Sequence, residues 1–364
     1  MSAPLLVIAA GGTGGHMFPA QALAEEMLGR GWRVVLSTDA RGARYAGGFP
    51  EAVERRVVRS ATFARGGVLG KLTAPFVIGL GVLSTLRQMR RARPACVAGF
   101  GGYPAIPAML AAMLLKSPRI IHEQNGVMGR VNRFFANRVD VVACGVWPTS
   151  GAGSNARHLG NPVRSEVLSR AGARYAHPES GPVRVLVFGG SQGAQVLSQV
   201  VPEAIARLPE ALRARIEITQ QARPEDEDAV RQAYASLNIT ADVRPFYDDI
   251  PERLSQAHLV ISRAGASSVA EITALGRPSI LIPYAHAAGD HQTHNARPLV
   301  EAGAARMIAQ SELTADTLLP HIAEILSQPE VAIRMSLAAR NAARPHAARH
   351  LADLVEATSS GERP

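Results

Sequence analysis

Short apolar runs alternate with amphipathic stretches along the first half of this chain. Each run is long enough for one strand, and the stretch that follows most of them has helical spacing. Such alternation predicts a parallel sheet covered by helices on both faces, because each crossover helix returns the chain to the same edge. The predicted strands of this half are residues 5–10, 33–37, 95–100, 119–122 and 140–144.

The alternating pattern stops between residues 151 and 182, where Gly and Pro cluster, and then resumes. Strands are predicted at 183–188, 215–219, 242–244, 259–262 and 279–283. We therefore predict an α/β protein of two facing Rossmann-like doubly wound domains, with a ligand-binding cleft between them. The expected parts are an N-terminal domain over 1–158, a linker over 159–182, a C-terminal domain over 183–340, and a C-terminal helix or tail over 341–364 that can pack back on the N-terminal domain.

The run Gly11-Gly12-Thr13-Gly14-Gly15-His16 directly follows the first predicted strand. Its glycines let the backbone approach a ligand closely. The amphipathic stretch from Met17 to Arg30 predicts a helix whose N-terminus offers free N–H groups to an anion. No Gly-Lys-Ser/Thr follows, so the run is not a P-loop, and its spacing does not match the dinucleotide motif. It predicts a phosphate-binding turn that ends in a titratable side chain, and it disfavours a dehydrogenase.

Polar and glycine-rich clusters stand at the ends of six predicted strands. They cover residues 13–16, 99–103 and 122–125 in the first half, and 191–193, 263–267 and 290–295 in the second. Clusters at equivalent positions of so many strands indicate a bound ligand, because loops at the carboxyl edge of a parallel sheet carry its binding site.

The balance of charges changes this picture only slightly. The chain has 39 Lys and Arg against 30 Asp and Glu, a formal net charge of +9, and 5% aromatic residues. A basic chain favours an anionic partner such as nucleic acid, anionic lipid or a phosphorylated substrate, although many arginines can simply be solvated. Without aromatic residues interleaved among the basic ones, we expect no nucleic acid as partner.

The candidate metal ligands do not form a recognisable metal site. Cys96 and Cys144 lie inside apolar runs, which predicts buried thiols and fits a reducing cytoplasm. Three histidines lie close together without a Cys or paired carboxylates to complete a site; they are His286, His291 and His294. The acidic run 226–228 is better explained as the start of a helix. We expect neither a metal nor another cofactor.

The most apolar segment, residues 72–86, has fifteen residues, fewer than the roughly 20 that a transmembrane helix needs. Four arginines follow it, namely Arg87, Arg90, Arg91 and Arg93. The pattern predicts a helix that lies in a bilayer interface with its arginines on anionic head groups. The alternative is a buried helix whose basic last turn complements the helix dipole. The N-terminus lacks the basic region and cleavage pattern of a signal peptide.

Seven motifs together resemble the bacterial N-acetylglucosaminyltransferase family that completes lipid II, the last cytoplasmic step of peptidoglycan precursor synthesis. They occur in the family's order across nearly 290 residues: GGTGGH (11–16), GFGGYPAIPA (99–108), HEQN (122–125), GNPVR (160–164), GGSQGA (189–194), SRAGASSVAE (262–271) and DHQTHNA (290–296). The first motif occurs in glycosyltransferases of this two-domain type generally, whereas HEQN together with GGSQGA is far more specific.

The resemblance implies a GT-B type glycosyltransferase that inverts the anomeric centre and requires no metal. The donor would be UDP-N-acetylglucosamine, and the acceptor would be lipid I, the undecaprenyl-diphosphate-linked N-acetylmuramoyl pentapeptide. The new bond would be β-1,4, and the product lipid II. The implied location is peripheral, on the cytoplasmic face of the inner membrane, with an anionic membrane surface and cell-wall synthesis and division proteins as partners.

The resemblance also implies which residues bind the substrates. In similar proteins the C-terminal domain holds the donor, with Arg164 and Ser191 at the diphosphate, the backbone of Ile250 at the uracil and Gln292 at the sugar hydroxyls. The full donor set would be Thr13, Gly14, Gly15, Asn125, Arg164, Ser191, Gln192, Ile250, Arg263, Ala266, Ser267, Ser268, Val269, Ala270, Glu271 and Gln292. The acceptor set would be Gly101, Gly102, Tyr103 and His122.

Two assignments leave alternatives open. His16 is the expected general base, because an imidazole can take the proton of an acceptor hydroxyl at neutral pH. The alternative is that His16 only orients the acceptor diphosphate, with Glu123 as the reserve base. Glu271 either accepts from a ribose diol or completes a capping box with Ser268.

A lipid-linked acceptor lies in the bilayer, which would explain the apolar segment 72–86 as a contact with the membrane. We expect Phe76, Val77, Ile78 and Leu80 to enter the bilayer interface, beside Arg87, Arg90 and Arg91. Two rival functions remain: an epimerase or other transferase on the same scaffold with the same donor, and a non-catalytic membrane-recruiting subunit. An epimerase would consume the donor without an acceptor, and a recruiting subunit would bind the donor without releasing UDP.

Overall fold

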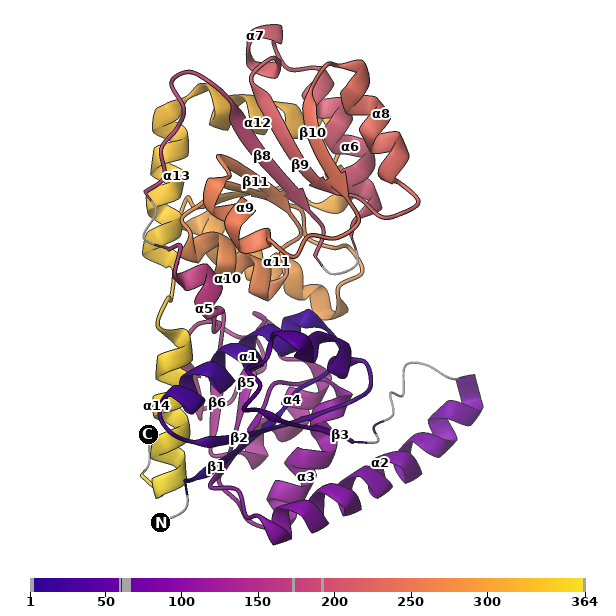
Figure 1. Ribbon diagram of the computed structural model, residues 1–364, viewed down its shortest axis with the longest axis vertical. Coiled ribbons are helices and arrows are strands. Elements are labelled where there is room, and N and C mark those ends of the chain that lie inside the picture. Colours follow the sequence, from indigo (N-terminus) through magenta and orange to yellow (C-terminus); the bar gives the residue numbers. More distant parts are fainter. Residues whose placement is uncertain (1–2, 59, 61–66, 172–173, 191–192, 363–364) are drawn as a thin grey trace. The chain divides into compact units, whose positions relative to one another are not determined.

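The alternating strands and helices form two parallel sheets, one in each of two units. The computed structural model describes residues 3–58, 60, 67–171, 174–190 and 193–362 (Figure 1). Unit 1 consists of Met1–Ser165 and Pro345–Pro364, and unit 2 of Glu166–Arg344. The residues expected to form the linker, 159–182, are therefore divided between the units, and the short helix α5 (Ser165–Leu168) spans the division.

The sheet of unit 1 has seven parallel strands in the order β3-β2-β1-β4-β5-β6-β7 among the described residues. The strands are β1 (Leu5–Ala9), β2 (Arg33–Thr38), β3 (Glu54–Val57), β4 (Cys96–Gly99), β5 (Arg119–Glu123), β6 (Val141–Cys144) and β7 (Ala156–His158). The helices are α1 (Gly14–Gly29), α2 (Gly67–Arg91), α3 (Ile106–Leu114), α4 (Arg130–Phe135) and α14 (Ala347–Ser360), with short 3₁₀ helices η1 (Gly42–Gly48), η2 (Tyr103–Ala105) and η3 (Ala136–Arg138).

Strand β1 shows why this sheet is buried on both faces. Successive side chains of a strand point to opposite faces. Leu6 and Ile8 pack with residues of α1 and α14, whereas Leu5 and Val7 pack with residues of α2, α3 and α4. All five residues of β1 are buried, so the strand is one continuous apolar run, as expected for a central parallel strand.

The C-terminal helix α14 belongs to unit 1, although more than 180 residues of chain separate it from the rest of that unit. It lies against α1, and Leu351 and Val355 enter the same core as Met17 and Leu23 (Figure 1). Arg30 at the end of α1 forms ion pairs with Asp353 at 2.7 Å and Glu356 at 2.6 Å.

Unit 2 repeats the doubly wound arrangement with six strands in the order β10-β9-β8-β11-β12-β13 among the described residues. The strands are β8 (Val183–Phe188), β9 (Ile216–Gln221), β10 (Thr240–Arg244), β11 (Leu259–Ser262), β12 (Ser279–Leu281) and β13 (Ala305–Met307). The helices are α6 (Gln195–Ala206), α7 (Glu210–Arg213), α8 (Glu227–Ser236), α9 (Ile250–Gln256), α10 (Ala266–Ala274), α11 (His291–Glu301), α12 (Ala315–Ser327) and α13 (Pro329–Ala342), with η4 (Ala288–Asp290) and η5 (Gln310–Glu312).

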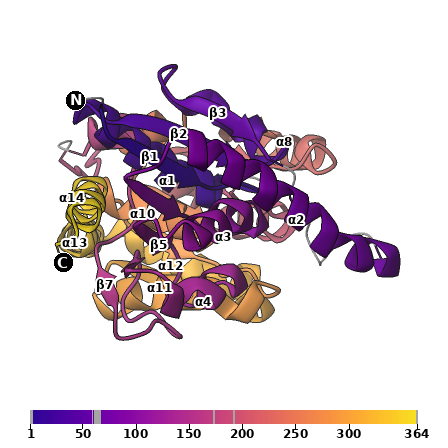
Figure 2. The same cartoon turned by 90° about the horizontal axis from the view of Figure 1, so that it is seen from below.

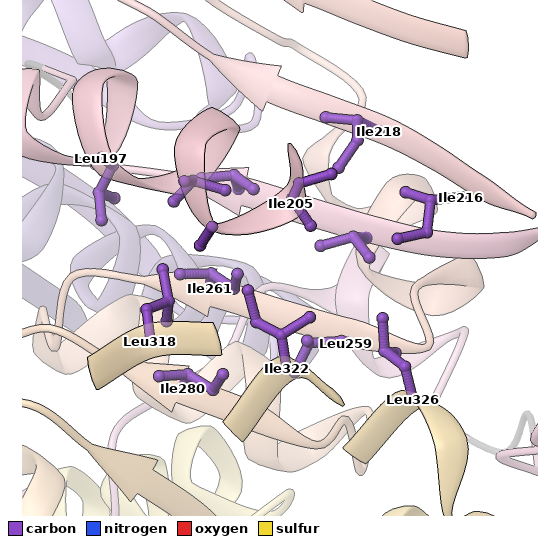
Figure 3. Packing of buried hydrophobic residues seen from close by; sticks show 14 of the residues in the cluster. Leu197, Ile205, Ile216, Ile218, Leu259, Ile261, Ile280, Leu318, Ile322 and Leu326 are labelled. Atoms are coloured by element: carbon purple, nitrogen blue, oxygen red, sulfur yellow. The ribbon is translucent and has the colours of Figure 1, made fainter. Parts of the chain in front are cut away.

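The main core of unit 2 lies between its sheet and the helices α6, α8 and α12. Ile261 of β11 points toward Leu318 and Ile322 of α12, and Ile205 of α6 packs above β9 (Figure 3). These side chains are fully or almost fully buried. The acidic run 226–228 stands at the start of α8, with Asp226 as N-cap, so the prediction of a helix start there is confirmed.

The predicted fold class is confirmed, but three strands were missed and one helix start was wrong. The missed strands β3, β7 and β13 are edge strands with exposed or half-exposed residues, so they lack the apolar run that marks a central strand. Helix α1 begins at Gly14 rather than at the predicted Met17, because the carbonyl of Thr13 accepts from the N–H groups of His16 and Met17. His16 therefore stands in the first helical turn.

Each sheet has one topological switch point, where the strand order reverses. In unit 1 it lies between β1 and β4, and in unit 2 between β8 and β11. The register sets Ala9 level with Gly99, and Phe188 level with Ser262. Ligands of doubly wound sheets bind outside the strand carboxyl ends at such points. The GGTGGH and GFGG motifs lie at the first switch point, and Gly189, Gly190 and the SRAG motif lie at the second.

Candidate functional site

The first switch point combines a helix N-terminus with an imidazole. Thr13 is the N-cap of α1, and in the described structure its hydroxyl does not cap the helix. The N–H groups of a first helical turn have no intrahelical partner and favour an anion. Thr13 and Gly15 are exposed, and His16 is half-buried. Gly12 N–H is directed elsewhere, to Asp39 Oδ1 at 3.3 Å.

The loop after β4 passes close over His16. Gly101 and Gly102 have φ values of +88° and +73°, which residues with a side chain rarely adopt. A Cβ atom on Gly101 would lie 3.3 Å from Cε1 of His16, and one on Gly102 would lie 3.5 Å from its Cδ2. Glycine at both positions therefore permits the turn and the approach to the ring. Tyr103 follows as the first residue of η2.

Gln124 lies on the other side of His16. Its Oε1 atom is 3.2 Å from Nδ1 of His16, and its side chain is buried. Gln124 follows β5, so residues that follow β1, β4 and β5 come together around one imidazole. The sequence analysis named His16 but assigned no task to Gln124.

His122 is buried behind this site rather than exposed to a ligand. Its side chain is 1% exposed, and its Nε2 atom donates to the carbonyl of Gly160 at 3.1 Å. Its Nδ1 atom lies 3.2 Å from Nε2 of Gln124. Burial lowers the pKa of His122 to about 4, although the Gly160 carbonyl and the nearby Glu123 oppose the shift. The geometry does not support the expected direct contact of His122 with the acceptor, because both ring nitrogens are used inside the unit.

Glu123, the reserve base, is also buried and holds the loop that follows it. Its Oε1 accepts from the backbone N–H and the amide of Asn125, both at 3.1 Å. Its Oε2 accepts from Gly129 N–H and from Asn132, both at 2.9 Å. Both carboxylate oxygens are thus engaged by donors inside unit 1 rather than directed at a substrate, so this geometry favours His16 as the base. Asn125 is held at the edge of the same loop.

Arg164 places a positive charge near the start of α1. Its guanidinium carbon lies 4.5 Å from the ring centre of Phe18. That ring in turn packs against Gly14, since a Cβ atom there would lie 3.0 Å from Phe18. The expected role of Arg164 in binding an anion thus remains a prediction, and the position of its guanidinium near the start of α1 suits that role.

In unit 2, helix α11 holds the loop that follows β11. Gln292 Oε1 accepts from the N–H groups of Ala264 at 3.2 Å and Tyr284 at 2.9 Å. Asn295 Nδ2 donates to the carbonyl of Ala264 at 3.0 Å. Both backbone groups of Ala264 are therefore bonded to the DHQTHNA motif. The Nε2 donors of Gln292 are the atoms through which it can contact a sugar.

Arg263 does not have the position that the sequence analysis expected. It is buried, and Nη1 donates to the carbonyls of Ile282 and Pro283 at 3.2 and 3.3 Å. Its guanidinium also lies 5.3 Å from the ring centre of Tyr284. Burial lowers the pKa of this guanidinium. Arg263 thus ties β11 to the loop after β12, and the expected contact with a diphosphate is not supported.

Helix α10 presents its N-terminus at the second switch point. It begins at Ala266 with Gly265 as N-cap, and Val269 N–H donates to the Gly265 carbonyl. The predicted capping box of Ser268 and Glu271 is therefore wrong, because Ser268 already stands inside the first turn. Ser267 Oγ is buried and has no hydrogen-bond partner among the described residues. The remaining expected residues of this helix follow in sequence: Val269 and Glu271, both buried, and Ala270.

Three further residues were expected at the donor site. Ser191 and Gln192 lie outside the described residues. Ile250 is the first residue of α9 and is half-buried. The sequence analysis missed Gln221, whose side chain accepts from Gly189 N–H at 3.1 Å and donates to the Pro245 carbonyl at 3.1 Å. It also missed the exposed ring of Phe246 beside Pro245, an aromatic in a loop at a strand carboxyl end.

The expected membrane segment forms helix α2, which lies beside α3 in both views (Figures 1 and 2). Phe76 is 71% exposed, and Leu80 and Leu83 are exposed with it. Ile78 is only 9% exposed, and the helical period turns it inward, so the expectation that it enters a bilayer is wrong. Val77 is half-buried, and the arginines Arg87, Arg90 and Arg91 are exposed.

A cavity of about 820 Å³ opens between α2, α3 and α4. Its walls are almost entirely apolar, and they include Phe76, Leu83, Tyr103 and Phe134. Arg130 of α4 also lines the cavity, and the Arg138 guanidinium of η3 lies 4.5 Å from the ring centre of Phe134. Arg133 is a further exposed arginine on α4. The sequence analysis missed this second group of arginines.

The remaining sequence predictions concern thiols, metals and membrane spans. Cys96 and Cys144 are buried free thiols, as predicted, and burial raises the pKa of both. No group of three or more His, Cys, Asp or Glu side chains with metal-binding geometry occurs among the described residues. Within the same residues, no helix combines the length and the apolar character needed to cross a membrane.

Comparison with known proteins identifies the family. The glycosyltransferase family 28 N-terminal domain matches residues 6–144, and its C-terminal domain matches residues 184–351. The UDP-N-acetylglucosamine--N-acetylmuramyl-(pentapeptide) pyrophosphoryl-undecaprenol N-acetylglucosamine transferase of Caulobacter vibrioides is 50% identical over 360 residues, which is 98% of this chain and 99% of the relative. The chain belongs to this glycosyltransferase family.

Solved structures agree with this family assignment. The crystal structure of Acinetobacter baumannii MurG superimposes with a TM-score of 0.78 at 30% identity, covering 97% of this chain and 99% of that one. UDP-GlcNAc 2-epimerase from Neisseria meningitidis, bound to UDP-GlcNAc, has a TM-score of 0.68 at 12% identity, covering 97% and 99%. The epimerase, at 12% identity, shows a shared fold alone. The assignment to the glycosyltransferase family therefore rests on the MurG structure and on the sequence relatives.

Proposed function

We propose that this glycosyltransferase transfers N-acetylglucosamine from UDP-N-acetylglucosamine to the 4-hydroxyl of undecaprenyl-diphosphate-linked N-acetylmuramoyl pentapeptide, lipid I, giving lipid II for peptidoglycan. The observation that carries the proposal is the 50% identity along 98% of the chain to a relative named for that transfer. The geometry of the two switch points supports it, because each offers a helix N-terminus beside polar side chains.

The chemical step needs one base and a stabilised leaving group. Nε2 of His16 takes the proton of the acceptor hydroxyl, and the hydroxyl oxygen attacks the anomeric carbon of the donor sugar. The bond from that carbon to the diphosphate breaks, and its electron pair leaves with UDP. Attack opposite the leaving group inverts the anomeric centre and makes the β-1,4 bond.

Unit 2 is the proposed donor site. The N-terminus of α10, with the buried hydroxyl of Ser267, suits the diphosphate, and Glu271 is the proposed partner of the ribose. Gln292 would contact the sugar through Nε2, since its Oε1 is occupied by two backbone donors. Phe246 is an additional candidate for stacking on the uracil.

Unit 1 is the proposed acceptor site. The N-terminal turn of α1 suits the acceptor diphosphate, and Gly101 and Gly102 border His16. Thr13 and Arg164 keep their expected assignment to the donor. The proposal includes no metal: helix N-termini and a guanidinium would stabilise the diphosphates instead.

The exposed face of α2 is the proposed contact with an anionic membrane surface. Phe76, Leu80 and Leu83 would enter the interface, with exposed arginines on α2 and α4 near the head groups. The lipid tail of the acceptor requires such a location, which we propose to be the cytoplasmic face of the inner membrane. Cell-wall synthesis and division proteins are the further partners that this location suggests.

The direct test is UDP release by the purified protein with UDP-N-acetylglucosamine, with and without lipid I, in the presence of EDTA. Release that depends on lipid I and persists with EDTA is the expected result for a metal-independent transferase. If EDTA abolished the release of UDP, only the proposal that the reaction requires no metal would be contradicted. Consumption of the donor without lipid I would favour an epimerase, and a bound but unconsumed donor would favour a recruiting subunit.

A further inference from the structure

The side-chain amide of Gln124 has a single chemically reasonable orientation. Its Nε2 atom lies 3.1 Å from the carbonyl oxygen of Phe100 and 3.2 Å from that of His122. Carbonyl oxygens only accept hydrogen bonds, so the nitrogen must face them and not the amide oxygen. The oxygen of Gln124 therefore faces His16.

His122 strengthens this orientation from its own side. Its Nε2 donates to the carbonyl of Gly160, so that nitrogen carries the proton and Nδ1 is the unprotonated one. Nδ1 lies 3.2 Å from Nε2 of Gln124 and accepts from it. Because burial keeps His122 neutral down to a pKa of about 4, this pattern persists across the physiological pH range.

The backbone of Gln124 is held as well. Asn161 Nδ2 donates to the Gln124 carbonyl at 2.9 Å, and the side chain of Gln124 is 1% exposed. Rotation of the amide would place its oxygen against two carbonyl oxygens in a buried site, where no water can compensate for the lost hydrogen bonds. Gln124 is thus a rigid acceptor presented to the imidazole.

We infer that Gln124 is a positioning residue that sets the tautomer of His16. An amide oxygen only accepts, so Nδ1 of His16, 3.2 Å away, must carry the proton. The lone pair then lies on Nε2, the nitrogen on the far side of the ring from Gln124. The chain from Gly160 through His122 and Gln124 to His16 therefore prepares an imidazole whose basic nitrogen is available to a substrate. The catalytic meaning of this chain rests on the proposed function, whereas the tautomer itself does not.

The tautomer can be measured without substrate, by long-range ¹H–¹⁵N correlation NMR on protein labelled with ¹⁵N-histidine at pH 8, with the His16→Gln and His122→Asn variants used for assignment. We expect opposite tautomers in one protein: Nδ1–H on His16 and Nε2–H on His122. An Nε2–H form of His16 in the unaltered protein would overturn the inference, whether or not the protein transfers N-acetylglucosamine.

The positioning role is tested with Gln124→Met, which keeps similar volume but has no acceptor. We expect kcat to fall roughly 10- to 100-fold, part of the usual contribution of a general base, with the KM for UDP-N-acetylglucosamine unchanged and His16 no longer confined to Nδ1–H. The control is Gln220→Met: Gln220 is also buried, donates to the Leu197 carbonyl and accepts from Tyr234, and both of these partners lie in unit 2.

The control separates positioning from general damage to the fold. Gln220→Met should lower stability but leave kcat and the His16 tautomer unchanged. An unchanged kcat and tautomer in folded Gln124→Met would contradict the inference. If Gln124→Met does not fold, the spectrum of the unaltered protein still decides the tautomer. A protein without transferase activity but with the predicted tautomers would refute the proposed function and leave the tautomer assignment standing.

Discussion

Leu83 lies two helical turns after Phe76 on α2, and both side chains are exposed on a helix that packs against α3. Residues seven apart share a face of an α-helix, so the two form one apolar face together with Leu80. Ile78 between them is buried. The same apolar segment thus contributes both to the core of unit 1 and to its surface.

Replacing Phe76 and Leu83 together with Ser should weaken binding to anionic vesicles about 10- to 100-fold, because two large apolar side chains would no longer be buried in the interface. Flotation with vesicles of anionic phospholipid measures this. Leu337→Ser in unit 2, where Leu337 is also exposed, is the matched control and should bind normally. Ile78→Ser should instead lower the urea midpoint. Unchanged vesicle binding of the double variant would contradict the proposed membrane face.

His16→Gln should lower kcat by about 10²- to 10⁴-fold, because the step loses its general base. The affinity for UDP-N-acetylglucosamine, measured by calorimetry, should not change. His350→Gln, on the exposed surface of α14, is the control and should keep full activity. A loss of donor affinity with little change in kcat would instead support a binding role for His16.

Stability should decrease in acid because of His122. Burial lowers its pKa to about 4, below the value of about 6.5 in the unfolded chain, so the unfolded state binds more protons between these values. The contribution of neutral His122 to the free energy of unfolding is fully present above pH 6.5 and is lost as the pH falls toward 4. At pH 5 the loss from this group is about 2 kcal/mol.

Urea unfolding at pH 7.5 and pH 5.0 measures this loss. His122→Asn, which does not titrate, should lose less stability than the unaltered protein between the two pH values. His258 in unit 2 also has its pKa lowered to about 4, by burial and by nearby arginines, so the comparison is repeated in the His258→Asn background. Equal losses with and without His122 would show that it is not the titrating group.

Gln292→Met should weaken donor binding by leaving the N–H groups of Ala264 and Tyr284 without their acceptor. The Ala264 N–H is partly buried, and leaving such a group unpaired costs about 1–3 kcal/mol, so we expect about a tenfold rise in Kd for UDP-N-acetylglucosamine. Isothermal calorimetry measures the Kd, with Gln256→Met on the exposed surface of α9 as control. A Kd equal to that of the control would show that the loop keeps its shape without Gln292.

Several errors of the sequence analysis have one physical cause. His122 and Arg263 have residue types that suit a ligand and a phosphate, and Ile78 has one that suits a bilayer. All three are buried, and the two polar side chains bond to carbonyl groups of their own unit. A polar side chain near a strand end either faces a ligand or satisfies a buried carbonyl. The choice depends on neighbours from distant parts of the chain, such as Gly160 for His122.

Local patterns by themselves determined the two doubly wound sheets, their central strands and the position of His16 after β1, because hydrophobic periodicity and glycine-rich turns act over a few residues. The edge strands β3, β7 and β13 escaped detection because their side chains are partly exposed. Only the tertiary structure decided that Gln124 rather than Glu123 faces His16, that Gln292 and Asn295 hold Ala264, and that α14 completes unit 1. These relationships join residues far apart in the chain, and hydrogen-bond direction and burial depend on where packing brings them together.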